Sequence, residues 1–100
     1  MIRGTTPTHV FNLHLDTSLI KTIVICYAQN DSVKLLKWTE ACTLEGENAS
    51  VTLSQEETLS FKADIDIKVQ VRTLLQNGTA PAFRPVWIRC DDALYDEVLT

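Results

Sequence analysis

The stretch Lys62–Thr73, with the sequence KADIDIKVQVRT, decides the fold. Two sets of residues alternate along its whole length: Ala63, Ile65, Ile67, Val69, Val71 and Thr73 lie between Lys62, Asp64, Asp66, Lys68, Gln70 and Arg72. Successive side chains of a strand point to opposite faces of a sheet. The pattern therefore predicts a long β-strand that has one face on a core and the other face in water.

Four segments nearer the N-terminus also predict strands. His9–Leu15 alternates in the same way, and Leu19–Gln29 is apolar on both of its faces. A strand that is apolar on both faces is usually central in its sheet or covered. Val33–Trp38 and Ala49–Leu53 follow, each after a turn rich in Asn, Asp, Gly and Glu.

The pair Asn77-Gly78 is the strongest short signal for a hairpin. The chain should return from it as a strand within Ala80–Cys90. This segment contains Pro81 and Pro85, and proline cannot donate a hydrogen bond to a neighbouring strand. We therefore expect an edge strand or a bulged strand.

The chain has 100 residues, of which 45% are hydrophobic, so residues 1–100 should form a single domain. Ser54-Gln55-Glu56-Glu57 has the pattern of a helix capping box and predicts one helical turn. Strands spaced in this way predict an all-β fold, an antiparallel β-sandwich of immunoglobulin-like type with about seven strands and one short helical turn. A small, partly open barrel is the alternative. Residues 91–100 should be an acidic tail or a short helix.

Composition excludes several classes of partner. The net charge of −4 and only nine lysines and arginines argue against binding to nucleic acid or to an anionic membrane. Residues 1–8 lack the apolar centre of a secretory signal, so we expect the chain to stay in the cytosol or to leave it inside a larger assembly. The three cysteines, Cys26, Cys42 and Cys90, form no Cys-x-x-Cys pair, so we expect free thiols rather than a disulfide or a metal site.

The residues do not predict an enzyme. His9 and His14 are the only plausible bases, and their odd separation places them on opposite faces of a strand. We expect one partly buried and one solvated histidine, with no metal and no cofactor. A hydrolase that uses His14 is the weakest hypothesis.

The best candidates for an interface surround Trp87. If Val86 and Ile88 face inward, Trp87 faces outward beside Arg89 on the expected edge strand. Exposed tryptophan and arginine are enriched at the centres of protein interfaces. The candidates for the interface are Trp87, Arg89, Arg84, Gln70 and Arg72.

Several segments resemble small proteins from the structural gene modules of phages and prophages of Gram-positive bacteria. The matching segments are Arg3–Phe11, Tyr27–Asn30, Leu53–Thr58, Val69–Arg72 and Asp92–Leu99. The start is also loosely similar to the N-terminal domain of phage baseplate upper proteins, where Arg-Gly-Thr leads directly into a strand.

The resemblance implies a non-catalytic virion structural or assembly component, found in the host cytoplasm during assembly and then in the virion. Its partners would be other virion components or a second copy of this chain, joined through a sheet edge. The alternative is a carbohydrate-binding module in which Trp87, Tyr27 or Trp38 stacks on a sugar.

Overall fold

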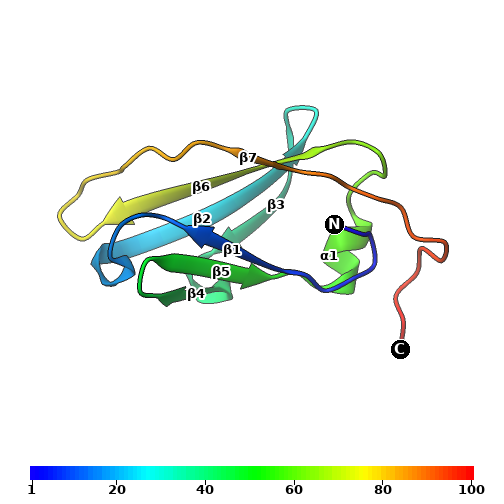
Figure 1. Cartoon of the computed structure of the whole chain (residues 1–100), viewed down its shortest axis with the longest axis horizontal. Helices are drawn as coiled ribbons and strands as arrows, with labels where there is room; N and C mark the ends of the chain where they lie inside the picture. The colour runs from blue at the N-terminus through cyan, green and yellow to red at the C-terminus, as the bar shows by residue number, and fades with distance from the viewer.

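The computed structural model describes residues 1–100 and contains two antiparallel sheets that enclose one core (Figure 1). The smaller sheet has the order β1-β5-β4, and the larger has the order β3-β2-β6-β7. The strands are β1 (Thr8–Asn12), β2 (Ile20–Gln29), β3 (Ser32–Trp38), β4 (Cys42–Glu45), β5 (Asn48–Thr52), β6 (Ile67–Leu75) and β7 (Val86–Ile88). The prediction of about seven antiparallel strands in a sandwich-like arrangement is confirmed.

Strand β6 holds the alternation that the sequence predicted, but it begins later. The predicted strand started at Lys62, whereas β6 starts at Ile67. Asp64 has a φ of 63°, a left-handed conformation that no regular strand accommodates. The buried Gln29 holds this turn, because its Nε2 donates to the carbonyls of Lys62 and Ile65 at 2.8 Å and its Oε1 accepts from the Lys62 amide. From Ile67 onward the odd-numbered residues as far as Thr73 are buried.

Strand β2 is internal in its sheet, between β3 and β6, as its two apolar faces predicted. The returning strand is at an edge, as predicted, but it is much shorter than Ala80–Cys90, because only Val86–Ile88 pairs with β6. Strand β4 was not predicted. It has four residues, and the alternation of Cys42 and Leu44 with Thr43 and Glu45 is too brief to distinguish a strand from the turn before Ala49.

The helical turn α1 (Gln55–Leu59) has the predicted capping box. The Ser54 hydroxyl accepts from the Glu57 amide at 3.1 Å, and the Glu57 carboxylate accepts from the Ser54 amide at 2.9 Å. Glu57 also pairs with Lys37 of β3, at 2.6 Å. Residues 91–100 contain no helix, so of the two alternatives they form a tail.

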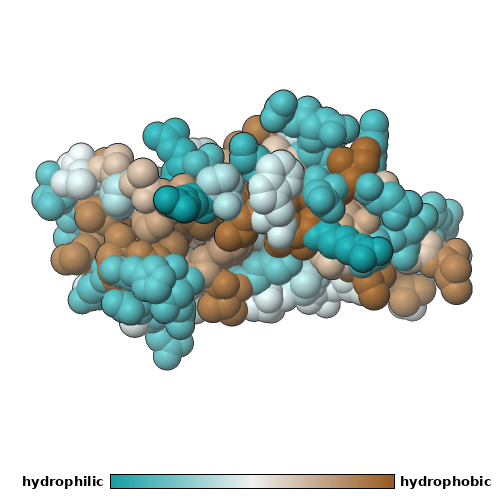
Figure 2. Space-filling view, turned by 45° about the horizontal axis from the view of Figure 1, so that its top comes forward, coloured by the Kyte–Doolittle hydropathy of each residue, from teal (hydrophilic) through white to brown (hydrophobic).

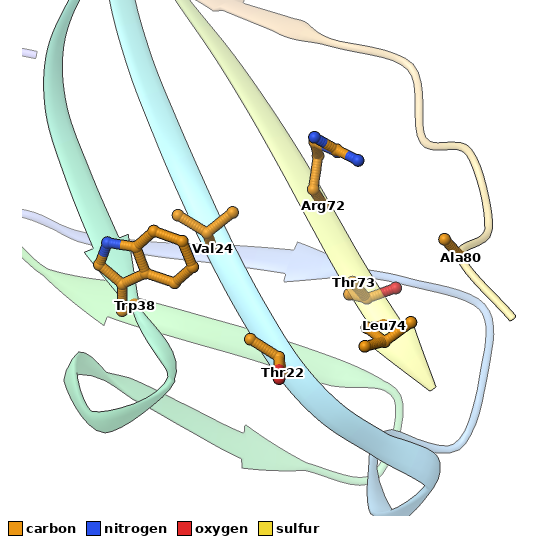
Figure 3. Close-up of a pocket in the computed structure, with 7 residues that line it drawn as sticks. All are labelled: Thr22, Val24, Trp38, Arg72, Thr73, Leu74 and Ala80. Atoms are coloured by element: carbon orange, nitrogen blue, oxygen red, sulfur yellow. The ribbon is translucent and has the colours of Figure 1, made fainter. Parts of the chain in front are cut away.

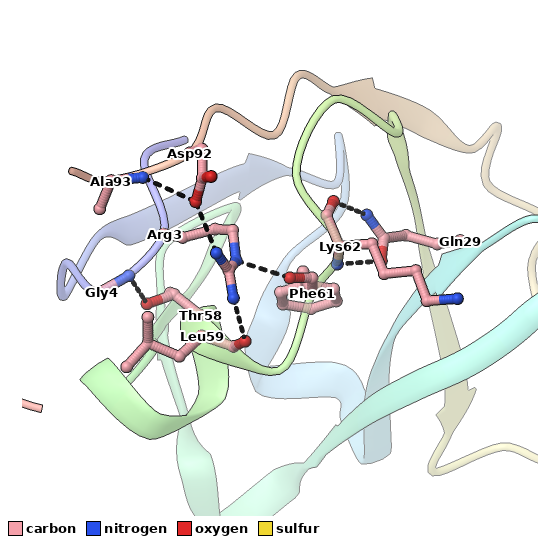
Figure 4. A network of polar contacts seen from close by, with 9 residues as sticks. All are labelled: Arg3, Gly4, Gln29, Thr58, Leu59, Phe61, Lys62, Asp92 and Ala93. Atoms are coloured by element: carbon pink, nitrogen blue, oxygen red, sulfur yellow. Dashed lines mark hydrogen bonds and ion pairs between the residues drawn. The ribbon is translucent and has the colours of Figure 1, made fainter. Parts of the chain in front are cut away.

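A cluster of polar contacts around Arg3 joins the two ends of the chain (Figure 4). The guanidinium of Arg3 donates to the carbonyls of Phe61 and Leu59, at 2.7 and 2.9 Å, and also pairs with the carboxylate of Asp92. The Arg3 amide donates to the Asp91 carbonyl at 2.9 Å. These contacts fix residues 91 and 92 beside α1 and leave the rest of the tail beyond them.

Candidate functional site

The larger sheet has one face on the core and one face that no strand or helix covers. We call the second face the outer face. Its residues follow from the strand registers and are Thr22, Val24, Cys26, Ala28, Val33, Leu36, Trp38, Lys68, Gln70, Arg72, Leu74 and Trp87. A sheet face with this many apolar side chains normally packs against another layer.

The registers place the outer-face residues in rows across the sheet. Trp38, Val24 and Arg72 lie opposite one another on β3, β2 and β6. The tryptophan is half exposed and has a shallow pocket of about 300 Å³ beside it. Figure 3 shows the residues that line this pocket. The Trp38 ring lies close to Val24 of β2, and Arg72 lies on β6, on the other side of β2 from Trp38. The row therefore combines an aromatic surface, an aliphatic floor and a cation.

The second tryptophan lies near the opposite edge of the same face. Trp87 on β7 is opposite Lys68 on β6, and Trp87 is 64% exposed. The ammonium of Lys68 lies 5.8 Å from the centre of the Trp87 ring, which is within range of a cation–π interaction. The only two tryptophans of the chain thus lie on the outer face.

The charge on the outer face is all of one sign. Strands β2, β3, β6 and β7 contain no Asp or Glu, although the whole chain has a net charge of −4. Lys68 and Arg72 lie on the outer face itself, and Lys34 is the extra residue of a β-bulge in β3. The surface is therefore apolar and basic on an otherwise acidic protein.

The outer face contains one cysteine, Cys26, among its hydroxyl, amide, cationic and apolar side chains. Its one nucleophile is Cys26, and burial raises the pKa of this thiol although Arg72 acts in the opposite sense. A thiol with a raised pKa stays protonated at neutral pH and is a poor nucleophile. No histidine or carboxylate belongs to the outer face.

Three of the five predicted interface residues lie together. Trp87, Gln70 and Arg72 all belong to the outer face. Arg89 follows β7, and its Nε donates to the Asp91 carboxylate at 2.9 Å. Arg84 instead borders a groove beside β1.

Leu36 was not named from the sequence, and Trp38 was named only as a platform for stacking on a sugar and not as a residue of the protein interface. A signal for this site was present in β2, whose second apolar face contains Val24 and Cys26. From its two apolar faces we expected this strand to be central in its sheet or covered. The structure leaves that face uncovered.

The two edge strands of the larger sheet, β3 and β7, are poorly suited to the addition of another strand. The β3 edge is interrupted by the bulge at Lys34, and bulges and lysines are devices that prevent edge pairing. Strand β7 has three residues and follows Pro85. The outer face is therefore a better candidate for an interface than either edge strand.

Part of β6 faces no strand on one side. The amides of a strand alternate in direction: Leu75 donates to the Thr79 carbonyl on one side, and Gln76 donates to the Leu19 carbonyl on the other. The amides of Val71 and Thr73 point to the same side as that of Leu75, but β7 pairs with β6 only as far as Val69. They have no backbone partner there.

The histidines are one partly buried and one exposed residue, as predicted, but they do not lie on opposite faces of one strand, because β1 ends at Asn12 and His14 follows it. His9 is partly buried, and its Nδ1 lies 2.8 Å from the hydroxyl of Tyr27. Burial, together with the charge of the N-terminus, lowers the pKa of His9. His14 is exposed, with a left-handed φ of 55°. The proposal that Tyr27 forms a sugar platform is wrong, because this residue is fully buried.

No group of three His, Cys, Asp or Glu side chains is placed to hold a metal ion. No helix has the length and apolar character needed to cross a membrane. No protein-family model, curated protein or solved structure matches the chain.

Proposed function

We propose that the chain is a non-catalytic module that binds another protein through its outer face, and that it acts in the virion of a phage or prophage or in its assembly. The observation that supports the first part is an uncovered sheet face with two exposed tryptophans and no acidic residue. The sequence resemblance described above supports the second part.

The composition of the outer face favours a protein partner. Trp38, Leu36 and Val24 form an apolar patch on the β3 side of this face, while Lys68 and Arg72 supply charge and hydrogen-bond donors beside it. Protein interfaces are rich in tryptophan and arginine at their centres and have polar groups around them. In this proposal the partners are other virion components or a second copy, with no role for nucleic acid or membrane. The chain is in the host cytoplasm during assembly and later in the particle.

We also propose an immunoglobulin-like origin for the sandwich. In that fold, strands 1, 2, 5 and 4 form one sheet, and strands 3, 6 and 7 form the other. Here six of the seven strands have this assignment, and only β2 lies in the other sheet, between β3 and β6. The two arrangements therefore differ only in the sheet to which the second strand, β2, belongs.

Incorporation into particles tests the proposed function. Trp87→Asp and Leu36→Asp each place a charge on the outer face, whereas Thr43→Asp places the same charge on an exposed residue of β4 in the other sheet. Particles induced from the host should contain the natural chain and the Thr43→Asp variant, detected by mass spectrometry, but neither outer-face variant. If purified particles lack the natural chain, or if they take up all four chains equally, the proposal is wrong.

The pocket beside Trp38 favours carbohydrate binding as a second candidate function. An aromatic ring next to an arginine is suited to stacking and hydrogen bonding with a sugar, and Arg72 borders this pocket. In this case cell-wall glycans should change the tryptophan fluorescence of the natural chain, and Trp38→Ala should abolish that change. Flat titrations across a panel of glycans would exclude this function.

A further inference from the structure

The last ten residues, Asp91–Thr100, have the opposite character to the outer face. They include four acidic residues and no lysine or arginine. Four large apolar or aromatic side chains among them are exposed, namely Leu94, Tyr95, Val98 and Leu99. Figure 2 shows apolar surface at the right-hand extremity of the molecule, which Figure 1 shows to be formed by this segment. The segment is thus both acidic and apolar, and it lies in water.

Few contacts hold this acidic segment to its own domain. Asp92 is anchored by Arg3, and Gln55 exchanges two hydrogen bonds with the backbone of Leu99. No backbone hydrogen bond joins residues 93–98 to the rest of the chain. The segment can therefore be recruited elsewhere at the loss of two exposed hydrogen bonds.

The outer face and the acidic segment complement each other. The face offers uncovered apolar side chains with Lys68 and Arg72 and has no carboxylate. The segment offers Leu94 and Val98 with neighbouring carboxylates and has no cation. Apolar contact supplies the attraction and the opposite charges supply the orientation, a division of roles that is common at protein interfaces.

The position of the acidic segment favours a second copy over the same molecule. In Figure 1 the segment leaves the body at the end where α1 lies and runs away from β2, β3 and β6. Asp92 stays fixed by Arg3. Trp87 lies only five residues before Asp92, and the eight residues after Asp92 reach at most about 29 Å when fully extended, so binding to the outer face of the same molecule would require the segment to fold back on itself. The outer face of a neighbouring copy can be met without this reversal of direction, at the loss of the two hydrogen bonds between Gln55 and Leu99.

We propose that the acidic segment of one copy binds the outer face of the next copy, so that copies join head to tail. The two surfaces are different, so the contact is heterologous and continues into a ring or a filament. This inference rests on the proposed role of the outer face and names its occupant.

Mixing two defective variants tests this arrangement. Leu94→Ser with Leu99→Ser removes the two most exposed apolar side chains of the acidic segment, and Arg72→Glu reverses a charge on the outer face. Thr43→Glu adds the same charge to the other sheet as a control. All four positions are exposed, so the fold should be retained, as circular dichroism would verify.

Sedimentation should show that the mass of the natural chain and of the control rises with concentration. Each defective variant should stay monomeric at concentrations at least tenfold higher. An equimolar mixture of the two should form a 1:1 dimer and nothing larger, because only one intact pair of surfaces remains. A natural chain that is monomeric at millimolar concentration, a segment variant that assembles as well as the natural chain, or a mixture that stays monomeric would each overturn the proposal.

A peptide with the sequence of residues 91–100 gives a second readout. It contains no tryptophan, whereas both tryptophans of the chain lie on the outer face. The peptide should shift the emission of the natural chain and not that of Arg72→Glu, and a scrambled peptide should have no effect. If the peptide does not bind while the outer-face variants still fail to enter particles, the head-to-tail inference is wrong and the proposed function stands.

Discussion

Replacing Thr73 with valine is expected to stabilise the protein. Thr73 lies on β6 opposite Ile23 of β2, on the face that packs against the core. Thr73 is 6% exposed, and its hydroxyl is the one buried side-chain polar atom without a hydrogen-bond partner. A buried hydroxyl that makes no hydrogen bond costs about 1–3 kcal/mol of stability. Valine has nearly the same shape, carries a methyl group there instead and favours strands.

We expect Thr73→Val to raise the free energy of unfolding by about 1–2 kcal/mol, which is the lower end of the range for a buried hydroxyl without a hydrogen bond. In a domain of this size each kcal/mol corresponds to about 4–8 °C in Tm. Urea denaturation followed by far-UV circular dichroism should show a higher midpoint with an unchanged m-value. Thr73→Ser keeps the hydroxyl and loses the methyl group, so it should lower the midpoint.

Thr58→Val is the matched control, because Thr58 is equally buried but its hydroxyl is satisfied. It donates to the Thr5 carbonyl and accepts from the Gly4 amide, both at 2.9 Å. Loss of these bonds should destabilise the fold by about 1–3 kcal/mol. If Thr73→Val destabilises the protein as Thr58→Val does, the Thr73 hydroxyl has a partner and the reasoning is refuted.

Three further outcomes are expected. The amides of Val71 and Thr73 should exchange with D₂O much faster than that of Arg72, as NMR can measure, because they face no neighbouring strand; equal protection would mean that the strand is paired on both sides. Asp31→Gly should stabilise the protein by up to about 1 kcal/mol in thermal unfolding, because Asp31 has a left-handed φ of 62° that glycine adopts freely; a lower Tm would contradict this. Burial lowers the pKa of His9 below its usual 6.5, so the unfolded chain binds the proton more strongly. Stability should therefore fall as the pH drops from above 6.5 through the folded pKa, and His9→Gln should reduce that loss; identical pH profiles would exclude this role.

The parts of the fold that the sequence predicted are those in which local pattern and tertiary packing agree. The alternation after Ile67 and the capping box at Ser54 are local signals, and both are present in the structure. The start of β6 was missed because the side chain of Gln29 holds Lys62–Asp66 in a turn, and Gln29 belongs to β2, which neighbours β6 in the sheet but is far from it in the sequence. Alternation of residue types cannot report a contact of that kind. The strand β4 was not predicted, because four alternating residues next to a turn do not distinguish a strand from the turn itself.

The candidate site was predictable in part. Trp87, Gln70 and Arg72 were identified because each falls on the polar or exposed side of its own strand. Trp38 could be placed with them only once the register with β2 was known, because that register sets it in a row with Val24 and Arg72. Cross-strand registers depend on turns and bulges, such as the bulge at Lys34, and one sequence does not fix them.

The contact between Arg3 and Asp92 orders events during synthesis. The two residues are 89 positions apart, so in a nascent chain the guanidinium can bond the Leu59 and Phe61 carbonyls but lacks its carboxylate partner until almost the whole domain has been translated. The hairpin of β2 and β3 needs only neighbouring residues and can form early. A ribosome that stalls just before codon 92 would therefore hold a chain with all seven strands whose first segment lacks its ion pair, a form more exposed to chaperones and proteases than the finished domain.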